Sequence, residues 1–324
     1  MKTIIISGGA GFVGSAVAKK AIADGYEICI LDDLSTGFRH NIPPQCAFVE
    51  GDIVNFEAFS GLPKKNVLAF FHIAGQSSGE ISHENPARDL DVNARGTLNA
   101  LEWCRRNGVK RFMYASSMSV YGKQPLDLPV REDAPLRPES FYGCSKLASE
   151  HLLRIYGDQH GIDWTALRMF NVYGPGQNLH NLKQGMVSIY LAYLVAGKPI
   201  LVKGSLDRFR DFVFIDDVVN IWMECLENAG TIREIFNLGF GKPVTVRSLL
   251  GLMFKIFNGG KVQDNIQEAN GTPGDLFGIY ADTTKLNSVF RYRLSADLQA
   301  GLSRMIEWAR EPASVKGLQF KGTE

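Results

Sequence analysis

Residues 141–146 read "FYGCSK" and place Tyr142 four positions before Lys146. Residues four apart share one face of a helix, so the lysine ammonium can lie near the tyrosine hydroxyl. A free phenol titrates near ~10 and is a poor base at neutral pH, but neighbouring positive charge favours the phenolate. A phenolate can take the proton of an alcohol, which makes the pair a candidate acid–base centre. The same spacing also occurs on ordinary helix surfaces.

A second chemical signal is a glycine-rich stretch near the N-terminus, "IISGGAGFVGSAVAKKAI", with Gly9, Gly11 and Gly14 in G-x-G-x-x-G spacing. The stretch lies between a predicted strand and a predicted helix. Glycines there allow a tight turn and close approach of the backbone to a pyrophosphate, which the helix N-terminus attracts. The pattern predicts a dinucleotide site formed by Gly8, Gly11, Phe12, Val13 and Gly14.

The acid that follows this loop selects between dinucleotides. Asp32 ends the second predicted strand, where a carboxylate accepts hydrogen bonds from the ribose hydroxyls and repels a 2′-phosphate, so NAD is favoured over NADP. Asp33 is a second candidate for cofactor contact. Either residue could instead cap the loop after the strand. The positive charge of an oxidised nicotinamide would further favour the Tyr142 phenolate.

Short β-branched runs alternate with longer helical patterns along the first half of the chain. Their continuous hydrophobicity predicts strands covered on both faces, hence a parallel sheet flanked by helices. We expect an α/β protein with a Rossmann-type doubly wound parallel sheet and a smaller C-terminal α/β domain. Residues 1–170 form the NAD-binding domain, to which 211–240 return, and 171–324 form the smaller domain. Strands are predicted at 3–7, 27–32, 46–52, 67–74, 111–117 and 163–171, and helices at 11–24, 86–108, 140–160 and 184–197.

Composition excludes several classes of protein. The chain has 324 residues, a formal charge of +1 and 45% hydrophobic residues, without runs of like charge, which argues against a nucleic-acid partner. Its five cysteines are scattered and never spaced C-x-x-C, and its six histidines are dispersed, so no metal site is expected. No signal segment and no run of the ~18 apolar residues of a membrane span is visible, which favours a cytoplasmic protein without membrane contact.

The ordered motifs resemble the extended short-chain dehydrogenase/reductase superfamily over nearly the whole chain. Within it they are most similar to the NAD-dependent sugar-nucleotide epimerases and dehydratases of the UDP-glucose 4-epimerase-like type. The resemblance implies NAD as cofactor and a nucleotide-diphosphate sugar as substrate. The matching stretches are "GGAGFVG", "LDDLSTG", "GDI", "HIAG", "NARGTLNALE", "YASSMSVYG", "YGCSK", "LRMFNVYGPGQ" and "RDFVFIDDVV".

The resemblance also implies roles for individual residues. Ser117 matches the family's catalytic Ser/Thr, which hydrogen-bonds the reacting oxygen and relays its proton to Tyr142, while Lys146 holds the nicotinamide ribose and lowers the pKa of the phenol. By resemblance Asp52 and Ile53 line the adenine pocket, Ile73, Ala74 and Gly75 pass along the cofactor, and Asn93 steadies the core of the site. Without the resemblance, Asp52 could be a turn residue and Asn93 a helix cap.

For the substrate, Asn171 is similar to the family residue that binds the diphosphate, and Arg210 resembles the phosphate-binding arginine. A guanidinium suits paired phosphate oxygens better than an ammonium does. The structural alternative for Arg210 is an ion pair with Asp211 or Asp207.

Three positions depart from the family pattern or are special to this chain. Where relatives often have another phosphate-binding arginine, this chain has Thr272, and we hypothesise that Arg208 supplies the missing charge. Ile279 matches a position that influences whether N-acetyl sugars fit. Glu80, in "QSSGEIS", is a candidate to bind sugar hydroxyls or act as an additional acid, unless it is a solvated loop residue.

The residues after Ser117 bear on the reaction. Relatives that dehydrate or decarboxylate usually carry an acid there, whereas this chain has Met118 and Ser119, which do no acid–base work at neutral pH. The remaining fate of a 4-keto sugar is rotation and hydride return to its opposite face, which is epimerisation at C4. The alternatives are an atypical dehydratase using Glu80, a C4 dehydrogenase or reductase, and a non-catalytic NAD-binding sensor. Pairing of helices 86–108 and 140–160 in relatives implies a homodimer.

Overall fold

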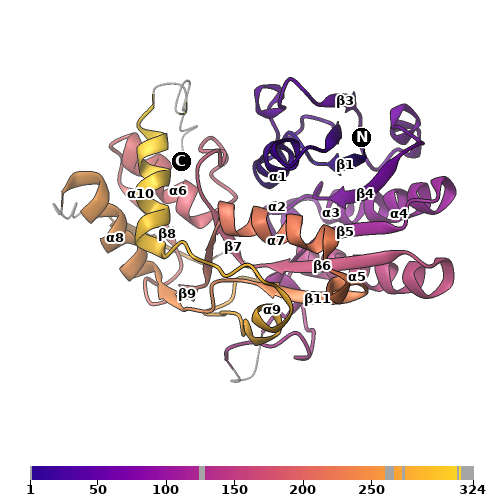
Figure 1. Cartoon of the computed structure of the whole chain (residues 1–324). Helices are drawn as coiled ribbons and strands as arrows, with labels where there is room; N and C mark the ends of the chain where they lie inside the picture. The colour runs from indigo at the N-terminus through magenta and orange to yellow at the C-terminus, as the bar shows by residue number, and fades with distance from the viewer. Residues whose placement is uncertain (1, 124–127, 260–265, 272–273, 312–313, 315–324) are drawn as a thin grey trace.

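The computed structural model describes residues 2–123, 128–259, 266–271, 274–311 and 314. At its centre lies a seven-stranded parallel sheet of order β3-β2-β1-β4-β5-β6-β11 (Figure 1). The order reverses between β1 and β4, so the loops beyond their carboxyl ends separate and leave a crevice. The predicted fold class is confirmed. The strands are β1 Thr3–Ser7, β2 Glu27–Asp32, β3 Ala47–Glu50, β4 Val67–His72, β5 Arg111–Ser117, β6 Asp163–Met169 and β11 Glu234–Leu238.

Helices cover both faces of this sheet, which explains the continuous apolar strands. Ile4 and Ile6 of β1 belong to the hydrophobic cluster that includes α1 and α7, whereas Ile5 belongs to the cluster that includes α4 and α5. All three are fully buried, because successive strand residues point to opposite faces. The covering helices are α1 Phe12–Ala23, α4 Gly96–Asn107, α5 Phe141–His160 and α7 Ile215–Glu227.

The helix predicted at 86–108 is divided in the structure. α3 (Pro86–Leu90) leads into a π-helical turn, Asp91–Arg95, before α4 begins. In that turn the carbonyl oxygen of Asn93 accepts bonds from Thr97 Oγ1 at 2.5 Å and Ser149 Oγ at 3.0 Å. Turns of this kind are frequent at functional sites, and this one lies against the helix that carries Tyr142 and Lys146.

The C-terminal part is a set of helices and two-stranded sheets beside the main sheet. Figure 1 shows α6, α8 and α10 grouped there, away from β1 to β4. The α-helices and strands of this part, together with α2 and α9, are α2 Gly79–Glu84, α6 Met186–Val195, α8 Val246–Asn258, α9 Thr284–Val289 and α10 Leu298–Ala309, and the pairs β7 Asn171–Tyr173 with β10 Phe212–Phe214, β8 Ile200–Lys203 with β13 Ile266–Ala269, and β9 Phe209–Arg210 with β12 Val244–Thr245.

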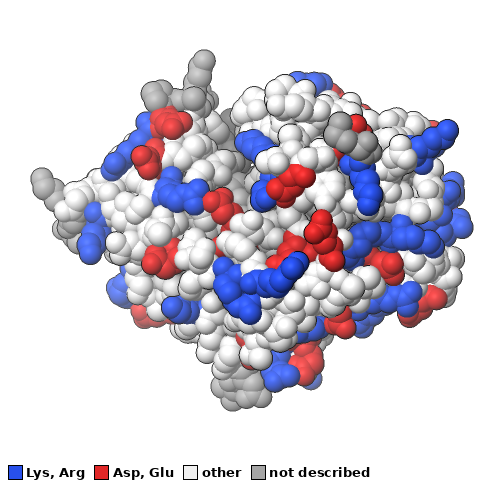
Figure 2. All heavy atoms as spheres, viewed as in Figure 1, with Lys and Arg blue, Asp and Glu red and all other residues white. Residues whose placement is uncertain are grey.

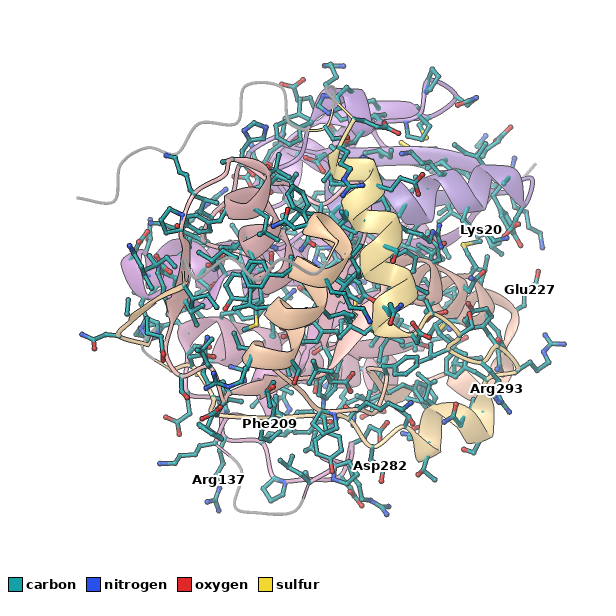
Figure 3. The ribbon with its side chains drawn as sticks, turned by 90° about the vertical axis from the view of Figure 1, so that its left-hand side faces the viewer. Lys20, Arg137, Phe209, Glu227, Asp282 and Arg293 are labelled. Carbon is teal, nitrogen blue, oxygen red and sulfur yellow. The ribbon has the colours of Figure 1, made fainter. Side chains whose placement is uncertain are left out.

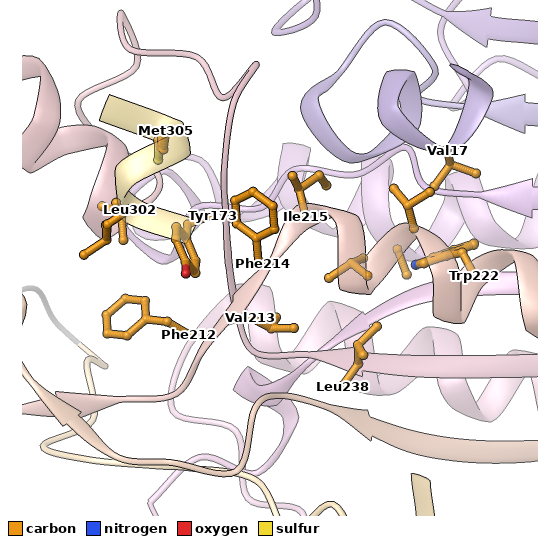
Figure 4. Packing of buried hydrophobic residues seen from close by; sticks show 14 of the residues in the cluster. Val17, Tyr173, Phe212, Val213, Phe214, Ile215, Trp222, Leu238, Leu302 and Met305 are labelled. Carbon is orange, nitrogen blue, oxygen red and sulfur yellow. The ribbon is translucent and has the colours of Figure 1, made fainter. Parts of the chain in front are cut away.

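One hydrophobic cluster joins the two parts. It runs from Val17 and Trp222, on one face of the main sheet, through Phe214 to Leu302 and Met305 of α10 (Figure 4). The chain returns to the main sheet as β11, which pairs in parallel with β6. The domain limits at 170 and 171, with the return of 211–240, stay a prediction.

The surface carries both signs of charge. Figure 2 shows Lys and Arg interspersed with Asp and Glu over the visible face. Within the described segments, no helix is both long and apolar enough to cross a membrane.

Candidate functional site

The glycine loop turns from β1 into α1 at the crevice. A Cβ on Gly14 would lie 2.1 Å from the carbonyl oxygen of Gly8, and one on Gly8, whose φ is +76°, would lie 2.5 Å from the nitrogen of Ala74. Gly11 precedes α1 without a side-chain cap, so the helix N-terminus stays accessible to phosphate. The loop therefore has the form that a dinucleotide pyrophosphate requires.

A cavity of about 440 Å³ follows this loop, and the structure brings nearly all predicted cofactor residues to its wall. Asn93 is the exception, since it does not line the cavity; its amide donates to Gln76 O at 3.0 Å and to Ser145 Oγ at 3.0 Å. The predicted residues on the wall are Gly8, Gly11, Phe12, Val13, Gly14, Asp32, Asp33, Asp52, Ile53, Ile73, Ala74, Gly75, Ser117, Tyr142 and Lys146.

Asp32 is buried at one end of the cavity. Its carboxylate accepts bonds from the backbone nitrogens of Ala10 at 2.9 Å and Leu34 at 2.8 Å, while burial raises its pKa. The carboxylate therefore braces both flanking loops at the position where a ribose would bind. Sequence reasoning missed Arg88 at the same end, which pairs with Asp52 at 2.9 Å.

The first turn of α5 brings Tyr142 to Ser117. Ser140 caps the helix by accepting a bond from the nitrogen of Gly143 at 3.1 Å. A Cβ on Gly143 would lie 2.4 Å from the carbonyl oxygen of Ser119, so glycine permits the close approach of α5 to the end of β5. In this arrangement Ser117 and Tyr142 line the same cavity, and the Ser117 hydroxyl acts to lower the pKa of the phenol.

Burial has the largest influence on the pKa values of Tyr142 and Lys146. It is the largest cause of the rise in the pKa of Tyr142 to about 12, which the Ser117 hydroxyl opposes and nearby Asp89 supports. Burial also lowers the pKa of Lys146 to about 8. The Lys146 Nζ donates to Ala115 O at 2.9 Å and lies 5.9 Å from the centre of the Tyr142 ring. In the protein alone, burial, Ser117 and Asp89 set the pKa of the phenol, and the expected lowering by Lys146 beside the cofactor stays a prediction.

Sequence reasoning also missed a buried carboxylate, that of Asp89, near the Tyr142–Lys146 pair. Asp89 is fully buried and accepts bonds from Ser145 Oγ at 2.6 Å and Gln76 Nε2 at 2.6 Å. Its position four residues before Asn93, in a helical stretch, was the available signal. Asp89 ties the helix of the Tyr–Lys pair to the π-helical turn.

A buried ion pair fixes the rest of α5. Glu150 and Arg168 are each 1% exposed and their charged groups lie 2.7 Å apart. Ser116 donates to the same carboxylate at 2.6 Å. Together these contacts hold α5 against β5 and β6, and hence hold Tyr142 against Ser117.

A second cavity of about 280 Å³ adjoins the first, with Met118, Ser119 and Asn171 on both walls. Glu80, Arg208 and Arg210 line it as predicted substrate residues. Ile279 lines neither cavity. It is 1% exposed and packs in the small hydrophobic cluster of Val120, Tyr121 and Phe170, and its influence on the fit of N-acetyl sugars stays a prediction.

Arg208 and Arg210 converge on one carboxylate. Both form ion pairs with Asp275, and Arg210 also donates to Leu276 O at 2.6 Å. Neither is paired with Asp211 or Asp207. Asp211 instead accepts bonds from the backbone nitrogens of three residues of other segments, Phe240, Gly241 and Ala281. Thr272 lies outside the described residues.

Aromatic packing holds β9, which contains Arg210 and directly follows Arg208. Phe209, marked in Figure 3, packs edge-to-face against Phe277 and Tyr280. A Cβ on Gly278 would lie 2.1 Å from the Phe209 ring, so glycine allows this contact. The packing sets β9 beside the segment of Asp275.

Glu80 lies in the first turn of α2 and contacts the C-terminal part. Its carboxylate pairs with Lys203 of β8 at 2.6 Å, and Ser78 donates to Lys183 O at 2.6 Å. These contacts connect the two sides of the second cavity. Lys203, which no local motif marks, was missed by sequence reasoning.

The described residues contain no group of three or more His, Cys, Asp or Glu side chains able to hold a metal ion. His72 is fully buried between Ser7 Oγ at 2.7 Å and Thr97 Oγ1 at 3.1 Å, and burial lowers its pKa to about 3. It has the structural role expected of a histidine within a strand.

The fold and this site define a dinucleotide-dependent enzyme of the short-chain dehydrogenase/reductase class, since a glycine loop, a strand-end acid and a Ser–Tyr–Lys set share one cavity. Residues 4–239 match the NAD dependent epimerase/dehydratase family, and the chain belongs to this family. The expectations of an NAD-dependent enzyme and of NAD as its cofactor are thereby confirmed.

Individual relatives cover almost the whole chain. A putative UDP-glucose 4-epimerase of Methanocaldococcus jannaschii is 34% identical over 95% of this chain and 98% of its own. The crystal structure of the Thermotoga maritima UDP-glucose 4-epimerase with UDP-glucose is 32% identical, with a TM-score of 0.90 over 96% of this chain and 99% of its own. The dTDP-glucose 4,6-dehydratase of Streptomyces venezuelae, solved with NAD bound, is 27% identical, with a TM-score of 0.89 over 98% of this chain and 100% of its own.

Proposed function

We propose that this protein is a nucleotide-sugar 4-epimerase that oxidises C4 of the sugar transiently and returns hydride to the opposite face. The observation that carries the proposal is the pair Met118 and Ser119, which follow Ser117 at the junction of the two cavities. Neither side chain exchanges protons at neutral pH, so elimination of water lacks the acid and base that it needs there. Reversal of the first oxidation requires no further group.

In this mechanism NAD, when bound, supplies the hydride acceptor. Tyr142 takes the proton of the C4 hydroxyl and later returns it, while Ser117 bonds both the reacting oxygen and the phenol. In the protein alone Tyr142 keeps its proton at neutral pH, because its pKa is raised to about 12. This form suits the step in which Tyr142 acts as the acid and returns the proton. For the base half, positive charge beside the phenol must offset the cost of burial. Lys146 contributes part of that charge and orients the nicotinamide ribose.

The second cavity supplies the charge that a diphosphate needs. Arg208 and Arg210 share one carboxylate, Asp275, so the three groups leave a net positive charge at the cavity wall. Guanidinium groups bind paired phosphate oxygens with two parallel hydrogen bonds. With Asn171 on the same wall, this cavity is the proposed nucleotide-sugar site. The named relatives support a UDP-sugar as substrate.

The test is product analysis with a panel of UDP-, GDP-, CDP- and dTDP-sugars, read by mass spectrometry and NMR. An epimerase gives an isomer of unchanged mass with inverted C4. A product lighter by one water would identify an atypical dehydratase, and a stable 4-keto or reduced product would identify a C4 dehydrogenase or reductase. Bound dinucleotide with every sugar of the panel recovered unchanged would indicate a sensor.

The dehydratase alternative depends on Glu80. Its carboxylate is 25% exposed and pairs with Lys203, which directs it toward β8 rather than toward Ser117. Loss of one water from any sugar of the panel would nevertheless overturn the epimerase proposal.

We also propose a homodimer formed through α4 and α5. Each helix exposes a large apolar side chain, Leu98 at 39% and Ile155 at 47%. Sedimentation of the wild type as a dimer, and of the variant Leu98→Glu/Ile155→Glu as a monomer, is expected. A monomeric wild type would contradict the proposal.

A further inference from the structure

Arg88 lies at the end of the first cavity that Asp32, Asp33 and Asp52 form. Its Nη2 is 2.9 Å from Asp52 Oδ2 and 3.7 Å from Asp33 Oδ2. The arginine side chain is 41% exposed, against 35% for Asp52 and 30% for Asp33. Arg88 thus joins the loop after β2 to the loop after β3, although it comes from α3.

The two carboxylates are oriented before they meet the arginine. Asp33 Oδ1 accepts bonds from the nitrogen of Ser35 at 3.0 Å and from its hydroxyl at 2.6 Å. Asp52 Oδ1 accepts a bond from the nitrogen of Val54 at 2.9 Å. In each case the loop uses Oδ1, which leaves Oδ2 for Arg88.

The backbone of Arg88 is fixed as well. Its nitrogen donates to the side chain of Asn85 at 3.1 Å, at the start of α3. The helix cap therefore fixes the backbone of Arg88, and the two loop carboxylates hold its guanidinium.

Both ion pairs form at one nitrogen of the guanidinium, Nη2, and the arginine side chain stays 41% exposed on the cavity wall. A guanidinium is planar, and a planar cation stacks well on an aromatic ring. The apolar side chains of Ile53 and Val92 line the same cavity and offer a second surface.

We propose that Arg88 forms one wall of the adenine slot and stacks its guanidinium on the adenine ring, with Asp33 and Asp52 keeping the side chain at that wall through their ion pairs with Nη2. In sites for NADP an arginine near the ribose binds the 2′-phosphate instead. Here the arginine is engaged by two carboxylates, and Asp32 adds a third negative charge, so a 2′-phosphate is repelled. This role concerns the dinucleotide alone and does not depend on the sugar or the reaction.

The test is calorimetric titration of the dinucleotide-free protein with NAD and with ADP-ribose, which carries the adenosine end without the nicotinamide. Arg88→Gln is expected to weaken both by about tenfold, the value of one partly exposed stacking contact. Arg88→Lys keeps the charge but has no planar face, and is expected to recover less than half of the loss. The control is Arg95→Gln, which removes an exposed i,i+4 ion pair with Asp91 outside the cavity.

The outcomes separate the possibilities. Affinity of Arg88→Gln for ADP-ribose within twofold of the wild type, with unchanged thermal unfolding, would overturn the proposal. Full recovery of the affinity by Arg88→Lys would mean that the charge of residue 88, and not stacking, supports binding, and would overturn the proposal. Binding of NADP as tightly as NAD by the wild type would identify Arg88 as a 2′-phosphate site and also overturn it.

Discussion

The two cavities differ in how the chain builds them. The cofactor cavity is formed by loops that follow consecutive strands of one sheet, and glycines bring its backbone segments into contact, as Gly14 does against Gly8. The substrate cavity is formed by segments far apart in the sequence, joined by ion pairs such as Glu80 with Lys203. The cofactor cavity therefore depends on steric fit and burial, whereas the substrate cavity depends on charge. We expect substitutions that add atoms to affect the cofactor cavity most, and substitutions that remove charge to affect the substrate cavity most.

The largest effect is expected where the two cavities meet. Tyr142→Phe removes the acid–base hydroxyl and should lower kcat by about 10²- to 10⁴-fold with little change in nucleotide-sugar affinity. Steady-state kinetics and sugar titration measure both. The control Tyr156→Phe removes a hydroxyl from the same helix that contacts Glu102 and should leave kcat unchanged. Intact turnover in Tyr142→Phe would end the proposed mechanism.

Burial at the cofactor side should also appear as a pH dependence of stability. The pKa of Lys146 is lowered from 10.5 to about 8, so between these values the unfolded chain binds more protons than the folded one. Stability therefore rises with pH across this window, by roughly 2–3 kcal/mol relative to Lys146→Met. Urea unfolding at pH 8 and pH 10, without dinucleotide, measures it.

The control for this difference is Lys110→Met, which removes an exposed lysine that donates to the carbonyl oxygen of His160. An equal pH dependence in the wild type and Lys146→Met would mean that Lys146 is not desolvated in the folded protein.

Steric fit of the cofactor cavity is tested by Gly14→Ala. Its Cβ would lie 2.1 Å from the oxygen of Gly8, so we expect a loss of about 2 kcal/mol in the free energy of unfolding and no measurable NAD binding. Gly251→Ala, in α8, has no atom within 4 Å of the new Cβ and should stabilise by about 0.5–1 kcal/mol. NAD binding by Gly14→Ala at wild-type affinity would contradict the steric account.

Charge in the substrate cavity is tested by Arg208→Ala. Its loss should weaken nucleotide-sugar binding by more than the ~1 kcal/mol upper range of an exposed ion pair, because Arg208 is only 8% exposed. Arg247→Ala, which breaks a surface pair with Asp207, is the matched control and should have no effect. Unchanged affinity in Arg208→Ala would reject the phosphate role.

The smallest effect is expected for the ion pair across the substrate cavity. Glu80→Gln and Lys203→Met should each raise KM about two- to threefold with kcat unchanged, and their coupling should be about 0.5 kcal/mol in a double-mutant cycle. A collapse of kcat in Glu80→Gln alone would instead give this residue an acid–base role and reopen the dehydratase alternative.

Sequence reasoning placed the strands of the main sheet and the helices that carry chemistry. β5 and α5 lie where the apolar run and the helical pattern predicted them, because burial on both faces of a parallel sheet marks each strand locally. The division of 86–108 was not predictable in the same way. The carbonyl of Asn93 bonds Ser149, from a distant helix, and no property of residues 86–108 announces that partner.

What the sequence determined by itself was the cofactor chemistry: a glycine loop, a strand-end acid, and a tyrosine one helical turn before a lysine are set by neighbours in the chain. Only the tertiary structure decided which charges meet, since Asp275 lies 65 residues from Arg210 and Lys203 lies 123 from Glu80. It also decided that the Tyr142 phenol holds its proton tightly. Burial is a property of the packed molecule, and the cost of removing a charge from water appears only once the surrounding segments have come together.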